Sequence, residues 1–523
     1  DALPIYVLTM RLYGNINKTD ADAADINTRQ NGSYAAGREG VRNKDINALL
    51  SWKLTPQQIV DFDYSYSRQG NIYAGDTQYS NANVSPDGLV STLYGDETNR
   101  MYRQSWGLTH NGIWDWGQST FGVYYEKTNN TRMQEGSTGK VEGMINNTEY
   151  ATSRLESYRS SGELNIPVFW LVDQTLTLGA EWNRDELNDP ASMQATSASG
   201  VQIGNVSGDA SSRSTQNSAT LTGIYLEDNI EARPGTDIIP GIRFDYHDEF
   251  GSNWSPSLNM SQELGDLFKL KAGIARVFKA PNLYQFSEGY LLSTRGNGCP
   301  NTIAAGSCYL LGNPDLDPEI SINKEIGLEF NYAGWDAGIT WFRNDYKNKI
   351  VAGTDIIGYA SNGNNILQWE NGGKAIVEGL EGNVVIPLVP ETLSWRTNAT
   401  YMIKSENKDT GNPLSVIPKY TINTLLDWQV NDKLSTQLQW TQYGRQKPRE
   451  YAETRNETGA MSDKEIGAYA VVGLGANYQM TKNLRLNAGI SNLFDKRIYR
   501  ENDGASTYNE PGRAYYAGVT MSF

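Results

Sequence analysis

The most informative absence from this 523-residue chain is a long hydrophobic run. Hydrophobic residues make up 38% of the sequence and mean hydropathy is −0.55. No stretch approaches the ~20 consecutive apolar residues that a membrane-spanning helix needs. The sequence therefore excludes membrane helices. It leaves a membrane β-barrel open, because the wall of such a barrel is apolar on alternate residues only.

Histidine and cysteine are also scarce. The chain has two histidines, His110 and His247, and two cysteines, Cys299 and Cys308, which lie together in one polar segment. In an oxidising compartment we expect the cysteines to form a disulfide, which closes a loop of about ten residues and contributes ~2.7 kcal/mol. A metal site is the alternative, but neither histidine is near the cysteines in sequence. We predict no bound metal and no cofactor.

Positive charge is in deficit, with a net charge of −15. This balance argues against nucleic acid as a partner, because binding to phosphate backbones requires basic surfaces. It does not exclude an anionic ligand, because local charge rather than net charge governs binding at a site.

The chain instead has an alternating pattern of apolar and polar residues. In the last strand, Tyr515, Ala517, Val519, Met521 and Phe523 share one face. Segments of about ten residues repeat this pattern, joined in turn by a tight turn and a long polar loop. The pattern predicts an all-β fold, a transmembrane antiparallel β-barrel. We expect about 20 strands, with short periplasmic turns and long extracellular loops.

The connections set the topology. The tight turns are predicted at 55–57, 233–236, 430–433 and 481–483. The first strand runs outward and the last runs inward, so the strand number is even. The long loops are predicted at 18–40, 71–97, 129–152, 186–216, 280–319, 348–372, 449–465 and 497–511. A secreted all-β sandwich or propeller is the alternative, although neither requires long and short connections to alternate.

Three motifs narrow the interpretation. Leu311–Phe330 reads LGNPDLDPEISINKEIGLEF, Arg276–Tyr284 reads RVFKAPNLY and Ser491–Lys496 reads SNLFDK. In this order and spacing they resemble the barrel of TonB-dependent outer-membrane receptors. Further segments at 36–47, 66–78, 94–100 and 508–513 resemble the ferric-enterobactin receptors, and the similarity covers nearly the whole chain from about Leu8.

The resemblance implies a receptor in the Gram-negative outer membrane that captures a ferric catecholate siderophore. Uptake would be driven by the TonB–ExbB–ExbD complex through an N-terminal plug domain, and iron would arrive only within the siderophore. Outer-membrane lipid and lipopolysaccharide would surround the barrel, and the family's possible further partners are colicins and phages.

The sequence departs from the pattern of the family that it resembles in two ways. The family barrel has about 22 strands and a plug. The plug is missing from this sequence, and residues 6–523 look like a partial barrel that enters at the third strand. Residues 1–5 match the translation of a sequencing-library adapter, so we expect a non-native leader there.

A ferric catecholate is bulky, aromatic and triply anionic, so its site needs cations and stacking rings. Arginine suits both needs, and by resemblance several candidates lie near ligand-contacting regions of the family. An alternative for each arginine is an ion pair at the rim or a contact with lipopolysaccharide, and for each tyrosine packing within its own loop. The predicted ligand contacts are Tyr73, Tyr79, Tyr94, Arg100, Arg103, Arg132, Tyr290 and Arg295.

Three rival functions remain at this stage. A receptor for another ferric siderophore would share all these features, whereas a passive porin would lack the three motifs. An outer-membrane enzyme would need a catalytic pair at the rim. His247 lies near Asp245, Asp248 and Glu249, a cluster that a solvated loop explains equally well, so we predict no enzyme activity.

Overall fold

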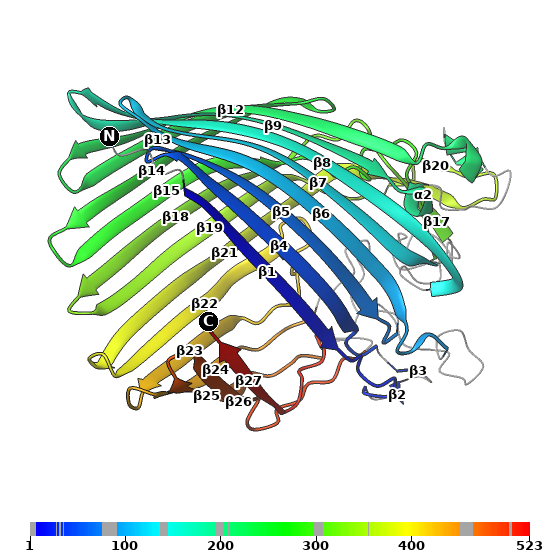
Figure 1. Cartoon of the computed structure of the whole chain (residues 1–523). Coiled ribbons are helices and arrows are strands. Elements are labelled where there is room, and N and C mark those ends of the chain that lie inside the picture. The colour runs from blue at the N-terminus through cyan, green and yellow to red at the C-terminus, as the bar shows by residue number, and fades with distance from the viewer. Residues whose placement is uncertain are drawn as a thin grey trace.

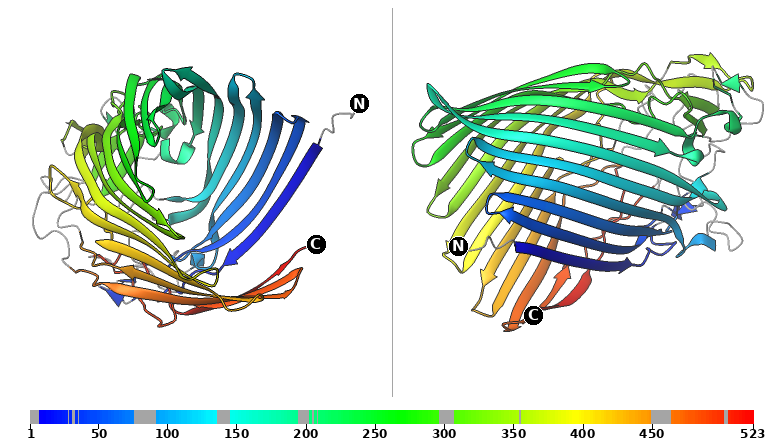
Figure 2. Two further views of the ribbon diagram at one scale, coloured as in Figure 1. Left: turned by 90° about the vertical axis from the view of Figure 1, so that its left-hand side faces the viewer. Right: turned by 45° about the horizontal axis from the view of Figure 1, so that its top comes forward.

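The computed structural model shows one long, curved antiparallel sheet (Figures 1 and 2). No helix in the described part of the chain is long and apolar enough to cross a membrane. The structure describes residues 7–27, 29–30, 33–34, 36–75, 92–135, 145–193, 202–203, 206–207, 209–295, 307–353, 355–448, 464–501 and 505–523.

Twenty long strands form the wall within the described residues, as the alternation predicted. Each pairs with the next in chain order. They are β1 (Val7–Thr19), β4 (Gly40–Thr55), β5 (Gln58–Ile72), β6 (Glu97–Trp114), β7 (Gly117–Glu135), β8 (Ile145–Trp170), β9 (Val172–Asn188), β12 (Gln216–Arg233), β13 (Thr236–His247), β14 (Gly251–Leu264), β15 (Phe268–Lys279), β18 (Glu319–Tyr332), β19 (Trp335–Ala352), β21 (Asn365–Val389), β22 (Leu393–Asn407), β23 (Tyr420–Gln429), β24 (Leu434–Tyr443), β25 (Tyr469–Thr481), β26 (Leu484–Ser491) and β27 (Ala514–Met521).

The ladder is continuous from β1 to β27. Within the described ranges no residue pairing joins these two strands, and Figure 2 shows a gap between them along one side of the wall. Both edge strands are exposed along nearly their whole length.

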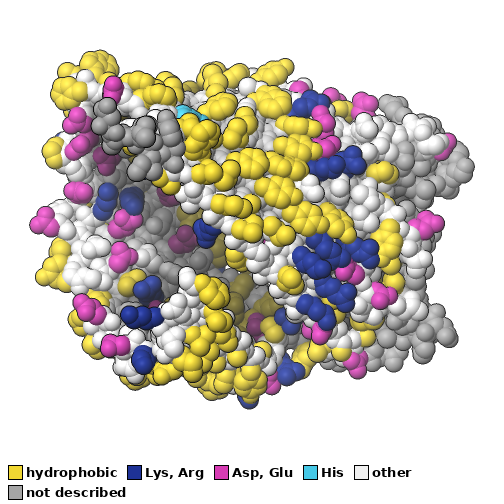
Figure 3. Space-filling view, in the orientation of Figure 1, with side chains coloured by type: hydrophobic (Ala, Val, Ile, Leu, Met, Phe, Trp, Pro, Cys, Tyr) yellow, Lys and Arg dark blue, Asp and Glu magenta, His cyan; other side chains and the backbone are white. Residues whose placement is uncertain are grey.

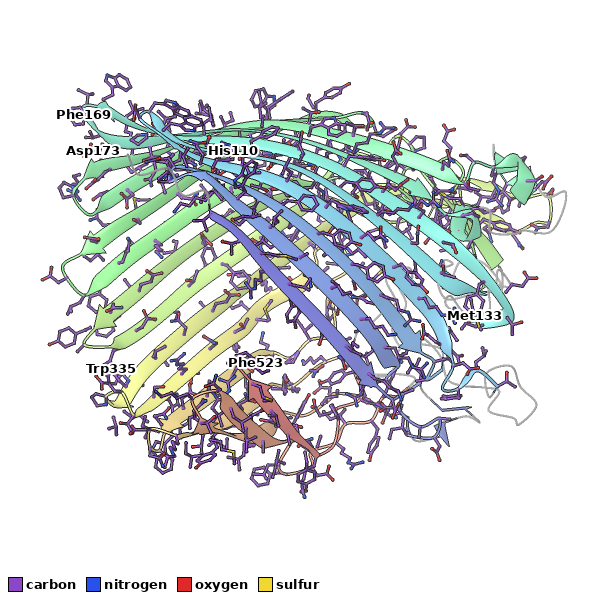
Figure 4. The ribbon with its side chains drawn as sticks, in the orientation of Figure 1. His110, Met133, Phe169, Asp173, Trp335 and Phe523 are labelled. Carbon is purple, nitrogen blue, oxygen red and sulfur yellow. The ribbon has the colours of Figure 1, made fainter. Side chains whose placement is uncertain are left out.

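The two ends of the wall differ as predicted. All four predicted tight turns are present, and they lie at the end where Figure 4 labels His110, Phe169, Asp173 and Trp335. The long loops lie at the opposite end, near Met133. Two connections at the loop end were not among the predicted loops: β13 and β14 are joined by only 248–250, and β22 and β23 are joined by 408–419.

Side chains alternate between the two faces of the wall. The face predicted to meet lipid is exposed in β27, where Tyr515 is 72% and Val519 65% exposed. Across neighbouring strands the outward residues form a continuous apolar band (Figure 3). Its loop-side border is a row of rings in which Tyr64, Trp106, Tyr125 and Tyr158 follow one another with centroids 5.1–5.4 Å apart. Such aromatic rows mark the membrane interface.

The best-packed core lies outside the apolar band, among the loops. Two short strands, β16 (Leu291–Arg295) and β17 (Ser307–Leu311), form a hairpin, and β17 then pairs in parallel with the start of β21. The other short strand here, β20 (Gly358–Tyr359), pairs with β21. Both faces of this small sheet are buried, in clusters that include Leu291, Ile366 and Leu367.

The remaining short elements also lie in the connections at the loop end. They are β2 (Arg29–Gln30), β3 (Ser33–Tyr34), α2 (Pro190–Met193), β10 (Gln202–Ile203), β11 (Val206–Ser207) and the 3-10 helix η1 (Ala210–Ser212).

The alternation makes a sharp prediction for stability. Leu50 faces outward between Met10 and Phe62, whereas Ser51 faces inward beside Asp61. We expect Leu50→Lys to destabilise the barrel by about 2–4 kcal/mol, because a lysine at mid-depth meets hydrocarbon, and Ser51→Lys to have little effect. Denaturant unfolding in phospholipid vesicles measures both, and equal losses would contradict the assigned faces.

Candidate ligand site

A cavity of about 730 Å³ opens on the inner face of β6–β9, toward the loop end. The 280–284 segment that follows β15 covers part of it. Phe121 and Val123 lie on the outer face of β7. Because side chains alternate along a strand, the even-numbered residues of β7 line the interior. The polar part of the lining includes Asn130, Arg159, Asp185, His247, Asn282 and Tyr284.

Tyr284 is held beside this cavity by a loop-to-loop contact. Its hydroxyl donates to the Asp189 carboxylate at 2.7 Å, and its ring lies 5.6 Å from that of Tyr290. Burial and then this hydrogen bond hold the pKa of Tyr284 well above its usual range, and the Arg132 charge offsets part of the rise. Tyr284 therefore remains a neutral phenol whose ring can stack, while its one hydroxyl hydrogen is donated to Asp189.

Arg132 joins the same group. It lies on the inward face of β7, and its Nη2 donates to Ser192 Oγ at 3.2 Å. Asp189 also accepts from the backbone N–H of Ser192, which fixes the start of α2 against the wall. The structure thus brings Arg132 and Tyr290, both predicted from sequence, next to Tyr284.

Two further arginines face inward on neighbouring strands. Arg103 on β6 pairs with Glu126 on β7, with Nη2 and Oε2 at 2.5 Å. Arg159 on β8 is exposed to the cavity and forms no ion pair with any described residue. We did not predict Arg159 or Tyr284. The alternation along β8 carried a signal for Arg159, because its neighbour Tyr158 belongs to the outward aromatic row.

Arg100 is placed elsewhere. It lies an even number of residues from the outward Leu108, so it is on the outer face of β6, unlike Arg103. There it pairs with Glu97 at 3.1 Å and lies over the Tyr150 ring. The predicted role of Arg100 in siderophore binding is therefore not supported by its position.

Tyr73 and Tyr94 pack within their own loop, which was the alternative for loop tyrosines. Tyr73 is 2% exposed and belongs to a cluster with Leu93 and Met133. Tyr94 packs its ring 5.8 Å from that of Tyr73 and donates to the Ala74 carbonyl. As placed, Tyr73 cannot touch a ligand, so this assignment is corrected.

The other predicted residues stay predictions. Tyr79, Cys299 and the side chain of Arg295 lie outside the described residues. Cys308 is fully buried in the loop sheet and is disulfide-bonded.

Two of the three sequence motifs fix loops by hydrogen bonds, and the first of these is Leu311–Phe330. Asn313 donates to the Trp369 carbonyl at 2.8 Å and accepts from the Asp315 N–H, and Glu319 accepts from the Ile350 N–H. Glu319 also begins β18, so the strand starts at the last residue of the loop predicted over 280–319.

The SNLFDK motif acts in the same way at the last loop. Asn492 donates to the carbonyls of Lys496 and Pro511, both at 2.6 Å. The Asp495 carboxylate accepts from the Arg513 N–H at 2.8 Å. These side chains fix loop bases and leave ligand contact to other residues.

The histidine cluster is structural. The His247 ring stacks on Phe250 at 4.4 Å, its Nδ1 accepts from the Glu249 N–H, and Asp245 pairs with Arg243. Among the described residues no group of three or more His, Cys, Asp or Glu side chains is arranged to hold a metal ion.

The fold and these motifs define a class of protein. The family described as "TonB dependent receptor-like, beta-barrel" matches residues 47–493, so the chain belongs to that family. It is a receptor of the Gram-negative outer membrane and a transporter, not an enzyme.

Individual relatives are close. The chain is 55% identical to the ferric enterobactin receptor PirA of Pseudomonas aeruginosa, over 99% of this chain and 70% of that protein. It is 46% identical to the ferrienterobactin receptor of Escherichia coli, over 98% and 72%. A solved structure of a mutant P. aeruginosa ferric enterobactin receptor, PfeA, in complex with enterobactin superimposes with a TM-score of 0.93 at 47% identity, covering 99% of this chain and 76% of that one.

The close packing of the 280–318 loop can be tested at Gly312. A Cβ at this position would lie 1.8 Å from the Ser287 carbonyl oxygen. Gly312→Ala must therefore displace the 280–318 loop, at a cost of about 1–3 kcal/mol. We expect faster limited proteolysis of that loop. Gly467→Ala, where the added Cβ meets nothing within 4 Å, is the control and should leave the digestion rate unchanged.

Proposed function

We propose that this barrel binds a ferric catecholate siderophore, with ferric enterobactin as the preferred ligand. The observation that carries the proposal is the inner face near the loop end. Arg159 and Tyr284 line one cavity there, Arg132 and the Tyr290 ring lie near Tyr284, and Arg103 lies on the inner face of the neighbouring strand β6. This face provides the cations and stacking surfaces that a triply anionic, aromatic complex requires. The names of the relatives and the enterobactin complex of PfeA support the same ligand.

The arrangement suits reversible capture. Arg159 has no carboxylate partner among the described residues, so an incoming anion need not displace one. Arg103 does have a partner, Glu126, and its side chain remains 53% exposed. Charge-assisted hydrogen bonds to catecholate oxygens would be roughly twice as strong as neutral ones.

Transport is a further part of the proposal. The family's uptake is coupled to the TonB complex, and the predicted coupling element is a plug domain outside this sequence. We infer that the chain supplies the wall and the outer binding surface, and that a plug joined to it would supply the gate and the energy coupling. A passive channel is disfavoured by the family assignment.

Binding can be tested by titrating the refolded chain in detergent with ferric enterobactin and following quenching of tryptophan fluorescence. We expect Arg132→Ala and Arg159→Ala each to lose about 1.5–3 kcal/mol of affinity, because each removes a charged hydrogen-bond donor. Ferric complexes of a hydroxamate and a carboxylate siderophore should bind more weakly than ferric enterobactin.

The matched control is Arg100→Ala, three residues from Arg103 but on the outer face. It should bind ferric enterobactin with parental affinity. If the Arg132→Ala, Arg159→Ala double variant also kept parental affinity, the proposed site would be wrong. Stronger binding of the hydroxamate would move the ligand to another siderophore class.

A further inference from the structure

The turn that joins β8 to β9 differs in composition from the other tight turns of the wall. Those turns contain a proline, a glycine or polar residues, as at 55–57, 233–236 and 481–483. Residues 168–172 instead read Val-Phe-Trp-Leu-Val, without a polar side chain. Figure 4 labels Phe169 at this turn, at the end of the wall opposite the long loops. We call residues 166–172 the apolar tip.

The apolar tip extends past the strands on either side of it. The pairing of β7 with β8 ends at Gln118 and Asn165, and the pairing of β9 with β12 ends at Gln174 and Ile230. In the part of the chain that the structure describes, the tip therefore pairs only within the β8–β9 hairpin. The β8 strand of the tip, 166–170, corresponds to about 17 Å of extended chain.

The side-chain pattern of β8 changes where β7 ends. Within the wall, the inward positions of β8 are polar up to Asn165 and the outward positions are mostly apolar. In the tip, the inward positions are Pro167 and Phe169, and the outward positions are Val168 and Trp170. Both faces are thus apolar from the point at which β8 leaves β7. A hairpin with two apolar faces requires an apolar environment on both sides.

This chain does not provide that environment. Phe169 is 76%, Trp170 71% and Leu171 84% exposed. Leu171 also has a φ of 69°, in the left-handed region that glycine adopts readily and a bulky side chain disfavours. The leucine side chain therefore gains little from packing within the hairpin and has an unfavourable backbone conformation. Its contribution must come from a contact outside the chain.

The backbone of the tip is partly prepared to leave water. The Trp170 carbonyl accepts a hydrogen bond from Gln174 Nε2 at 2.9 Å. Pro167 has no N–H group that could remain unpaired on an open strand edge. Backbone groups without an internal partner are costly in lipid, so both features lower the cost of placing the tip in a membrane.

We propose that the apolar tip is an anchor that inserts into the headgroup and upper acyl region of the periplasmic phospholipid leaflet. Its outward face continues the lipid-facing band of β8 through Leu164 and Ile166. At the neighbouring β6–β7 turn, the exposed rings of Trp114 and Trp116 stack 6.1 Å apart, and tryptophan is typical of the membrane interface.

The geometry of the wall explains how lipid reaches both faces of the tip. Strands of membrane barrels are tilted by roughly 35–45°. A hairpin that continues past its neighbours therefore moves sideways from the wall as well as toward the periplasm. Phospholipid is the occupant because the tip is continuous with the lipid-facing band and has no strand beside it that would separate its inward face from the membrane.

The test places an environment-sensitive fluorophore on a Phe169→Cys variant. Cys308 is disulfide-bonded, so thiol labelling without reductant reports the introduced cysteine. The labelled barrel is refolded into vesicles of phosphatidylethanolamine and phosphatidylglycerol, with or without bromine on the upper acyl chain. We expect brominated lipid to remove about half of the fluorescence, and aqueous iodide to have little effect.

The matched control is Asp432→Cys, an exposed position in the polar turn 430–433 at the same end of the wall. Its fluorophore should be quenched by iodide and not by brominated lipid. Adding Trp170→Ser and Leu171→Ser to the Phe169→Cys chain should lower lipid quenching to the level of this control. Equal iodide quenching at positions 169 and 432, or unchanged lipid quenching in the serine variant, would overturn the proposal.

A contact between barrels is the alternative occupant that the same measurement detects. Shielding from iodide without lipid quenching, and only at a high protein-to-lipid ratio, would assign the tip to a second copy and contradict lipid insertion. Retention of the heat-sensitive electrophoretic shift shows that each variant is folded. The serine variant should bind ferric enterobactin with parental affinity, because the tip lies at the opposite end of the wall from the candidate ligand site.

Discussion

The structure depends on one constraint: inside a bilayer every backbone N–H and C=O must be hydrogen-bonded within the protein. Between β1 and β27 the chain meets it with an antiparallel ladder in which each strand pairs with the next, whereas the outer edges of β1 and β27 have no strand partner among the described residues. Because side chains alternate along a strand, the same ladder assigns each residue to lipid or to the interior. The position of a residue along its strand sets its depth in the membrane. Whether it falls on an odd or an even position of that strand sets whether it faces lipid or the interior.

The alternation of side chains along a strand explains why residues of one type serve different purposes. Arg100 and Arg103 lie three residues apart on β6 and so face opposite sides of the wall. The first joins a carboxylate at the lipid border, and the second faces the barrel interior beside Glu126. Proximity in the sequence therefore says little about shared function in a barrel wall.

The sequence predicted the elements that repeat a local rule. The strand number, the tight turns, the lipid face of β27 and the start of β18 at Glu319 follow from alternation and turn chemistry. The ligand site follows no such rule. Tyr73 was predicted from its loop position, but it is buried by contacts with Leu93 and Met133, which only the folded loop brings together. Tyr284 was missed because its partner, Asp189, is distant in sequence.

The location of the packed core explains why the motifs lie where they do. The wall has lipid on one face and a polar interior on the other, so its residues lack a common core. The loops do have one, in the small sheet of β16, β17, β20 and β21. Asn313, Asn371 and Asn492 hold carbonyl groups at the bases of these loops, where strands can no longer satisfy them. The motifs are therefore most useful for recognising the family, because they mark where the ladder ends and the loops must be anchored above the membrane.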